Sequence, residues 1–342
     1  MTTTAHQTQH QTNAVLSNAP DTASRKLRIM VSALTRKRPV LVGNMIRSFG
    51  DMVLPDNCDV RCLIVENDNE RKTEAAVLAR LPLANGIPLD YVLETELGIP
   101  FGRNRAAREA IAWGADLLTY VDDDEFVDPK WLIELVKRYR ETGAALIGGP
   151  VLIPPSNESL SRIEQAFHDD LTAHYKQRAA GAIPAAQEGR ASPVTNNWLG
   201  EMSLFTEHGL WFDESLRFTG GSDSRFFHTA RARGFKLEWA PKAVVYADMT
   251  ADRLTFRTQL REAHSRAINR IRLDQVEKRF YWLRLPFSLL FKLISAILLA
   301  LTLPFTGGRG ILKLTQRLGL ITGRITAAFG GNSSLYTKIF GK

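Results

Sequence analysis

The sequence predicts an α/β fold with a mostly parallel, Rossmann-like central sheet and flanking helices. Short apolar runs alternate with segments of helical periodicity from residue 27 to residue 139, and this alternation requires crossover connections between parallel strands. Polar clusters follow the apolar runs directly, as Thr35–Arg38 follows Leu27–Ala33. Because ligands bind outside the carboxyl ends of the strands in open sheets of this kind, we expect these polar loops to meet in one crevice.

Each element is predicted from its own stretch of sequence. The run Leu27–Ala33 predicts a strand, and the apolar spacing from Leu41 to Phe49 predicts the helix that follows it. The unit then repeats, with strands expected at Val60–Val65, Leu89–Leu93 and Leu117–Val121, helices at 71–80, Arg103–Trp113 and 131–139, and later strands at 144–153, Trp198–Phe205 and Leu237–Val245.

The segment between the two halves of the expected sheet is mixed. One helix is predicted at Leu160–Tyr175, and the Gly/Ala/Pro-rich stretch Ala179–Pro193 predicts a mobile loop beside the site.

The composition indicates a globular protein of 342 residues. Charged residues make up 23% and apolar residues 44%, which excludes a largely disordered chain and a polytopic membrane protein. The cysteines, Cys58 and Cys62, are too few for a disulfide framework or a four-thiolate zinc site. Residues 1–24 are polar and lack the pattern of a secretory signal, so we expect a disordered leader there, a main domain over 25–275 and a separate C-terminal segment over 276–342.

The net charge of +8 is concentrated at the C-terminal end. From Arg279 onwards there are nine Lys or Arg and no Asp or Glu, and subtracting nine from +8 leaves −1 for residues 1–278. Because this basic tail is also apolar, it favours anionic lipid over nucleic acid as a partner.

Two stretches of the tail carry this expectation. Leu285–Phe305 has the length of a membrane span with a single charge, Lys292, and Ile311–Phe329 has the pattern of a basic amphipathic helix. The sequence leaves open whether the first stretch crosses the membrane or lies in it. The alternative is a pair of soluble helices packed on the main domain.

Three aspartates, Asp122–Asp124, follow the strand expected at Leu117–Val121. Side chains alternate along an extended chain, so Asp122 and Asp124 point the same way and can share a hard divalent cation. The alternative is an acidic helix N-terminus, which explains Asp128 but does not require three acids on the preceding strand end. The pattern favours a metal site.

At this point the ordered motifs resemble those of family 2 inverting glycosyltransferases of the GT-A fold, in the bacterial exopolysaccharide, succinoglycan-type branch. The resemblance covers residues 27–272, and the series in order is more specific than any single motif. It consists of Thr35-x-x-Arg38-Pro39, Glu66-Asn67-Asp68, Gly102-Arg103-Asn104, the Asp-x-Asp of Asp122–Asp124, and Gly220-Gly221-Ser222-Asp223.

The resemblance implies a role for each matched position. Thr35, Arg38, Glu66 and Asp68 would hold the base and ribose of a nucleotide sugar, and Arg103 and Asn104 its diphosphate. Asp124 would bind Mg²⁺ or Mn²⁺, Asp122 would lie near the ribose or sugar, and Asp223 would be the general base. Trp198 and Glu201 fall where related enzymes contact the acceptor.

The sequence departs from the family pattern at two places. Ser222 stands where the family commonly has Glu, and Val245–Asp248 lacks the His that often supplies a third metal ligand, for which Asp248 is a weak substitute. Two roles have alternatives: Trp198 could pack in the core, and Asp223 could cap a helix.

The resemblance and the tail together predict a hexosyltransferase at the cytoplasmic face of the inner membrane. It would use a nucleotide sugar, UDP-linked by expectation, and a lipid-linked oligosaccharide acceptor, with no nucleic-acid partner. A sugar nucleotidyltransferase is disfavoured because Ser32–Pro39 contains no glycine. A membrane-bound scaffold with a decayed site is the non-enzyme alternative.

Overall fold

The computed structural model describes residues 25–190, 192–193, 195–217, 220–277, 281–306 and 310–331. The leader predicted at 1–24 lies outside the described residues. The strands of the structure are β1 (Leu27–Thr35), β2 (Cys58–Asn67), β3 (Leu89–Glu94), β4 (Leu117–Asp122), β5 (Glu125–Val127), β6 (Leu146–Gly148), β7 (Val151–Leu152), β8 (Asn197–Glu201), β9 (Leu237–Trp239) and β10 (Val245–Ala247).

The helices follow the same alternation. They are α1 (Pro39–Gly50), α2 (Glu74–Leu78), α3 (Ile99–Trp113), α4 (Trp131–Thr142), α5 (Arg162–Gln187), α6 (Ser203–Thr206), α7 (Ser222–Ala232), α8 (Phe256–Glu277), α9 (Tyr281–Thr302) and α10 (Ile311–Ala328), with short 3-10 turns η1 (Glu214–Leu216), η2 (Ala251–Leu254) and η3 (Leu303–Thr306).

The central sheet has seven strands in the order β3-β2-β1-β4-β8-β6-β9. All its pairs are parallel except the two that β8 makes with β4 and β6. The predicted α/β fold with a mostly parallel sheet is therefore confirmed. The small second sheet, β5-β10-β7, lies beside the end of β4.

Period-two burial along the strands creates a hydrophobic layer on each face of the sheet. Ile29, Val31 and Ala33 of β1 pack in one cluster with apolar residues of α1 and α4, while Met30 packs in the other cluster with residues of α3 and α7. Alternate side chains of a strand point to opposite faces, so a strand of nine residues anchors helices on both sides.

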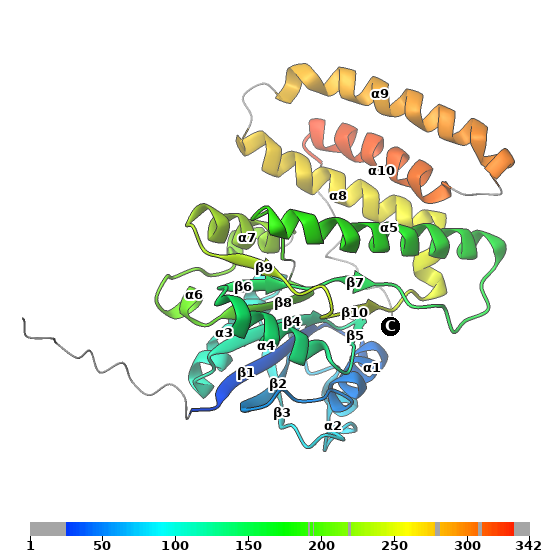
Figure 1. Cartoon of the computed structure of the whole chain (residues 1–342). Helices are drawn as coiled ribbons and strands as arrows, with labels where there is room; N and C mark the ends of the chain where they lie inside the picture. Colours follow the sequence, from blue (N-terminus) through cyan, green and yellow to red (C-terminus); the bar gives the residue numbers. More distant parts are fainter. Residues whose placement is uncertain are drawn as a thin grey trace, which may run out of the picture.

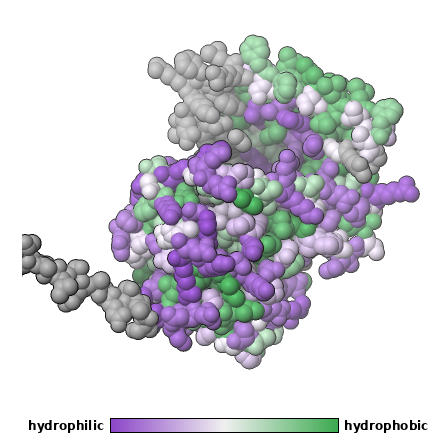
Figure 2. Space-filling view, viewed as in Figure 1, coloured by the Kyte–Doolittle hydropathy of each residue, from purple (hydrophilic) through white to green (hydrophobic). Residues whose placement is uncertain are grey.

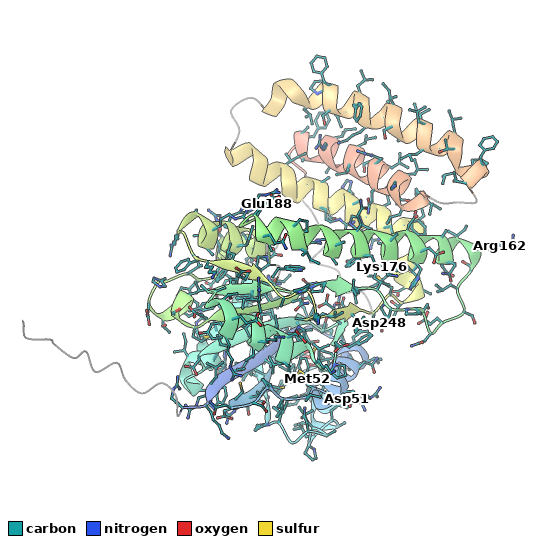
Figure 3. The ribbon with its side chains drawn as sticks, viewed as in Figure 1. Asp51, Met52, Arg162, Lys176, Glu188 and Asp248 are labelled. Carbon is teal, nitrogen blue, oxygen red and sulfur yellow. The ribbon has the colours of Figure 1, made fainter. Side chains whose placement is uncertain are left out.

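Helix α5 differs from the prediction, because it continues through the stretch expected to be a mobile loop. Ser161 and Glu164 form a capping box at its start, and it runs to Gln187 with Pro184 inside it. Its length is marked by Arg162 at one end and Glu188, just past the other end (Figure 3). Packing of α5 against the sheet on one side and α10 on the other outweighs the helix-breaking tendency of Gly181 and Pro184.

Two late strands are also shorter than predicted. The stretch Trp198–Phe205 divides into β8 and helix α6, and Leu237–Val245 divides into β9 and the start of β10. A backbone hydrogen bond marks each division. The amide of Met202 donates to the carbonyl of Asp116, and the amide of Ala243 donates to the carbonyl of Ala240.

The C-terminal helices form a layer above α5. In Figure 1, α8 and α10 lie over α5 and α9 is outermost. Helix α8 packs closely on α10, so the helical layer begins at Phe256, before the predicted boundary at 276. Asp170 of α5 accepts hydrogen bonds from the amides of Gly310 (3.0 Å) and Leu312 (3.2 Å) at the start of α10, which ties this layer to the main domain.

Candidate active site

The strand register brings the predicted polar loops to one edge of the sheet. Thr35 of β1 pairs with Glu66 of β2, and Leu34 pairs with Asp122 of β4. On the other side of β4, Val121 pairs with Asn197, where antiparallel β8 begins. The predicted convergence is therefore observed for loops that are far apart in sequence.

Asp123 anchors the loop after β1. Its side chain is buried and accepts hydrogen bonds from Thr35 Oγ1 at 2.8 Å and Arg38 Nη1 at 2.7 Å. Thr35 was predicted to contact nucleotide, but it is buried and its hydroxyl donates to Asp123. Thr35 therefore positions the loop instead. The sequence did not predict this structural role of Asp123, because only its neighbours, Asp122 and Asp124, were expected to face the site.

Asp122 and Asp124 lie on either side of Asp123 and repel one another. Burial, and next the charge of Asp124, raise the pKa of Asp122 to about 7, while the guanidinium of Arg103 opposes this rise. Asp223 is near enough to contribute to the same shift. The site thus concentrates negative charge that a cation or a proton must balance.

Asp124 is surrounded by positive charge and by a further acid. Arg253 of η2 donates to its carboxylate, and Arg38 Nη1 lies 3.6 Å from Oδ2. The backbone of Asp248 bonds the carbonyl of Asp124 at 3.0 Å, and burial raises the pKa of the Asp248 carboxyl. Arg253 was not predicted from the sequence, because it lies 129 positions from Asp124 in a stretch without a motif.

Glu125 is a buried acid that the sequence analysis also missed. One carboxylate oxygen accepts from Asn196 Nδ2 at 2.7 Å and the other from the amide of Asp122 at 3.3 Å. Burial raises the pKa of Glu125 well above its usual range, and the charge of Asp122 adds to this rise. Glu125 therefore connects the aspartate cluster to the start of β8.

The predicted pair Glu66 and Asp68 divides between two roles. Glu66 is fully buried and accepts from the amide and hydroxyl of Thr73, both at 2.9 Å, and from the hydroxyl of Tyr91. Glu66 therefore holds the loop after β2. Asp68 in this loop is also buried, 2% exposed, and its carboxylate lies 3.2 Å from Lys37 Nζ. Contact of either carboxylate with base or ribose stays a prediction.

The Arg103-Asn104 pair also separates. Arg103 Nη1 donates to Ser222 Oγ at 3.4 Å, so it lies between Asp122 and the start of α7, which carries Asp223. Asn104 is buried, and its amide exchanges hydrogen bonds with the backbone of Phe212 at 2.9 and 3.0 Å. The polar atoms of Asn104 hold the segment before α7 in this geometry, and its contact with the diphosphate stays a prediction.

Two predicted acceptor contacts do not face the crevice. The Trp198 ring is 1% exposed and packs on Tyr120 with centroids 5.4 Å apart. Glu201 pairs with Leu117 at the beginning of β4, the opposite edge of the sheet, where Tyr139 Oη donates to it at 2.9 Å. Antiparallel β8 carries its later residues, Glu201 among them, away from the end of β4, and the Trp198 ring packs in the hydrophobic core. Contact of either residue with the acceptor stays a prediction.

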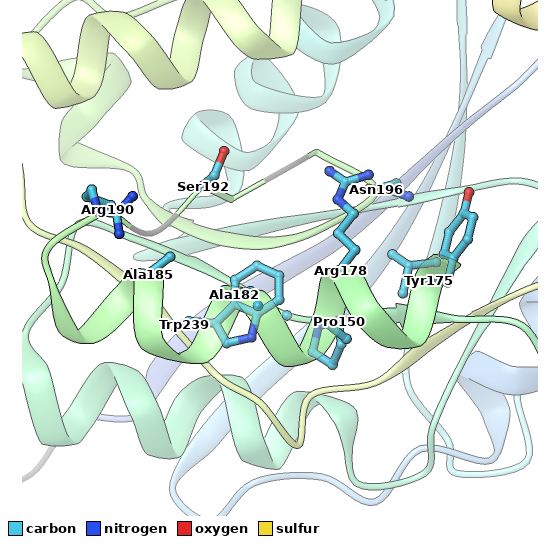
Figure 4. Close-up of a pocket in the computed structure, with 13 residues that line it drawn as sticks. Pro150, Tyr175, Arg178, Ala182, Ala185, Arg190, Ser192, Asn196 and Trp239 are labelled. Atoms are coloured by element: carbon cyan, nitrogen blue, oxygen red, sulfur yellow. The ribbon is translucent and has the colours of Figure 1, made fainter. Parts of the chain in front are cut away.

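A cavity of about 290 Å³ lies beneath α5. It lies at the ends of β6 and β9 and shares Asn196 with the Glu125 contact. Figure 4 shows Arg178, Asn196 and Tyr175 toward one end and Arg190 and Ser192 toward the other. No carboxylate within the described ranges forms an ion pair with Arg178, so its charge is available to a ligand.

The carboxylates at the end of β4 suit a hard divalent cation in part. Across the described residues, no three His, Cys, Asp or Glu side chains group as a complete metal site. Mg²⁺ sites in proteins commonly use one or two carboxylates and complete the coordination with substrate phosphates and water. Asp124, with Asp122 beside it, fits that arrangement, and the raised pKa of Asp122 reflects the repulsion that a cation would relieve.

Comparison with known proteins identifies a family model, a relative and a solved structure similar to this chain. Residues 34–194 match the model of Glycosyl transferase family 2. The succinoglycan biosynthesis protein ExoM of Rhizobium meliloti (strain 1021) is 28% identical over 233 residues, which cover 66% of this chain and 69% of that protein. The mannosyltransferase PcManGT of Pyrobaculum calidifontis, solved with GDP-Man and Mn²⁺, superposes with a TM-score of 0.62 at 14% identity over 90% of this chain and 88% of that chain. Residues 34–194 therefore carry a family 2 glycosyltransferase domain, and the chain is a glycosyltransferase with a GT-A-like fold.

Proposed function

We propose that the chain is an inverting hexosyltransferase of exopolysaccharide biosynthesis. It moves a hexose from a nucleotide sugar, UDP-linked by our expectation, to a hydroxyl of a lipid-linked oligosaccharide. The observation that carries the proposal is the meeting of Asp122, Asp124 and Asp223 at one sheet edge. The similarity to ExoM supports the biosynthetic role.

The donor would be held between the loops after β1, β2 and β4. Asp68 and Lys37 line the far part of this crevice, where base and ribose would lie. Arg38 and Arg253 lie beside Asp124, and guanidinium groups bind phosphate oxygens with two parallel hydrogen bonds. The diphosphate is therefore assigned to the end of β4.

Asp124 and Asp122 would hold Mg²⁺ or Mn²⁺ together with the diphosphate. The cation, when bound, offsets the negative charge that develops on the departing nucleoside diphosphate. Arg103 faces the same region and lowers the cost of ionising Asp122. The solved complex of PcManGT with GDP-Man and Mn²⁺ supports a divalent metal.

Asp223 would remove the proton of the attacking hydroxyl. It lies in the first turn of α7, next to Ser222, which accepts from Arg103. As the acceptor oxygen forms a bond to the anomeric carbon, its proton passes to the Asp223 carboxylate and the bond to the diphosphate oxygen breaks. A single displacement of this kind inverts the anomeric centre.

The acceptor would enter from the cavity beneath α5. Asn196, which lines the cavity, donates a hydrogen bond to Glu125 beside the aspartates, and Arg178 gives the cavity positive charge. A lipid-linked oligosaccharide with a diphosphate or acidic sugars matches that charge. The proposal places the enzyme at the cytoplasmic face of the inner membrane, where nucleotide sugars and lipid-linked acceptors meet.

The test compares Asp124→Asn, Asp223→Asn and a matched control, Asp59→Asn, whose side chain is 50% exposed at the beginning of β2. We expect Asp223→Asn to retain the thermal shift produced by UDP with Mn²⁺ and to lose transfer by roughly 10²-fold or more. Asp124→Asn should lose both the Mn²⁺-dependent thermal shift and transfer. Asp59→Asn should behave as wild type.

A specific outcome would contradict each expected result. Full metal-dependent transfer by Asp124→Asn would remove the metal assignment, and unchanged turnover by Asp223→Asn would place the base elsewhere. Release of pyrophosphate in place of a nucleoside diphosphate would identify a nucleotidyltransferase. Retention of the anomeric configuration, measured on the product by NMR, would exclude single displacement.

A further inference from the structure

Helix α9 has one covered face and one exposed face, and the two differ in polarity. By length and composition it could span a bilayer, and the span Leu285–Thr306 is 6% buried in its most apolar window. From Pro286 to Leu301 every exposed residue is apolar. The most exposed of the large ones are Phe287, Leu290, Phe291, Ile297, Leu298 and Leu301, from 52% to 76%.

Between Pro286 and Leu301, the polar residues of this helix lie on the covered face. Ser288, Lys292 and Ser295 are spaced four and three residues apart, which places them in one stripe, and all three are half-buried. Ala296 in the same stripe is 3% exposed. The single charge that counted against a clean membrane span is therefore turned toward the protein.

The polar stripe of α9 faces helix α10. Helix α10 packs against α9, and Arg324 Nη1 donates to Ser288 Oγ. Lys313, Arg317 and Arg324 of α10 are spaced four and seven residues apart, so they form a basic stripe along one side of that helix. In the described part of the chain no carboxylate forms an ion pair with any of them.

We propose that α9 is the membrane-docking surface of this enzyme and that it lies in the plane of the bilayer without crossing it. The outward apolar face enters the acyl boundary, and the basic stripe of α10 meets anionic headgroups. Figure 2 shows the hydrophobic residues gathered along the outer side of the molecule over α9.

If α9 crossed the bilayer, its contacts with α10 would be lost. A spanning α9 would have to leave α10, and Ser288, Lys292 and Ser295 would enter hydrocarbon without their present partners. Lying flat keeps these contacts and transfers only apolar side chains from water. Both ends of α9 then stay on the side where the nucleotide sugar is found.

Lipid is a better match to this surface than a second copy of the chain. The tail from Arg279 onwards has nine basic and no acidic residues, so two copies that met through this surface would bring like charges together. Anionic headgroups complement those charges.

The experiment measures depth in the membrane with the full chain and vesicles of phosphatidylcholine and phosphatidylglycerol. Single cysteines are introduced as Phe287→Cys, Ile294→Cys and Leu301→Cys in a Cys58→Ser background, because Cys62 is fully buried. Each carries an environment-sensitive fluorophore, and lipids with a nitroxide near the headgroup or near the chain end quench it. We expect all three positions to be quenched alike, and more strongly by the shallow nitroxide.

Binding is measured separately by vesicle sedimentation. Ile294→Glu combined with Leu298→Glu should lower partitioning at least tenfold, whereas Ile163→Glu, at an apolar residue of α5 that is 60% exposed, should leave it unchanged. Lys292→Leu should not strengthen binding, because Lys292 faces α10.

Several outcomes overturn the proposal. Deep quenching at position 294 with shallow quenching at 287 and 301 would show a spanning helix. Wild-type binding by the double Glu variant would show that another surface docks, and a dimer that this variant converts to monomer without loss of vesicle binding would assign the face to a second copy. The inference deepens the proposed function, but these measurements use no donor or acceptor, so failure of the transferase proposal leaves them interpretable.

Discussion

Asp122, Asp123 and Asp124 are consecutive, yet their environments differ completely. Asp123 points into the protein and holds Thr35 and Arg38. Asp122 is half-buried near Arg103 with a pKa raised to about 7, and Asp124 lies against Arg253. The acidic motif therefore consists of one structural carboxylate, Asp123, between two half-buried carboxylates that we propose bind the donor and its metal.

The structural role of Asp123 can be tested by its removal. Asp123→Ala leaves the buried ends of Thr35 and Arg38 without an acceptor, and we expect a loss of about 3 kcal/mol in the free energy of unfolding, measured by urea titration. Asp59→Ala, at an exposed carboxylate, should change it by less than about 0.5 kcal/mol. Equal effects of the two substitutions would contradict the assignment.

Substitution of Arg178 tests the proposal that the acceptor binds in the cavity beneath α5. Arg178→Ala should raise the acceptor KM about tenfold or more, because the cavity loses its unpaired charge, and leave the donor KM unchanged. Arg162→Ala, on an exposed residue of the same helix, is the matched control. An increase in donor KM would place Arg178 elsewhere in the reaction.

The sequence predicts which loops reach the site but not which of their side chains face it. Strand ends are visible as apolar runs that stop at polar clusters. Glu66 and Asp68 are two residues apart and would share one face of an extended strand, but β2 ends at Asn67, so the direction of Asp68 depends on the loop. Arg253 was not predicted because its partner, Asp124, is distant in sequence.

At the scale of elements, strands and short helices follow from local patterns, whereas α5 and β8 depend on tertiary contacts. The pattern at Ala179–Pro193 indicates a loop when read alone. The structure keeps it helical to Gln187 because it lies between the sheet and α10. The direction of β8 likewise depends on pairing with β4 and β6, which has no local signature.

Glycines of α10 allow its close contact with α8, and this contact can be tested by substitution. A Cβ on Gly323 would lie 2.8 Å from the Cβ of Ala267, closer than real contacts allow. We expect Gly323→Ala to separate the helices and to destabilise the protein by about 1 to 3 kcal/mol, measured by thermal unfolding.

Gly181 of α5 is the control for this substitution. It has open space around its added Cβ, so Gly181→Ala should stabilise the protein by about 0.5 to 1 kcal/mol. Destabilisation by Gly181→Ala would show that α5 tolerates no change in its middle, against the open space seen there.

At the scale of the molecule, charge and apolar surface both belong to the C-terminal layer. Vesicle binding should therefore weaken as NaCl is raised from 0.05 to about 0.5 M, because salt screens the basic stripe, but it should not vanish, since the apolar face of α9 is insensitive to screening. Sedimentation with anionic vesicles measures this. Complete release by salt would show that charge alone holds the protein to lipid.

The stacking of helices above the sheet fixes how far the chemistry stands from the lipid. With α9 in the bilayer surface, the layer of α8 and α10 and then α5 separate it from the cavity (Figure 1). Neighbouring helices pack 8 to 10 Å apart, so two such spacings place the transfer site roughly 20 Å from the headgroups. If α9 docks as proposed, a lipid-linked glycan that is one sugar long would not bridge that gap, and we expect the enzyme to act on acceptors that already carry several sugars.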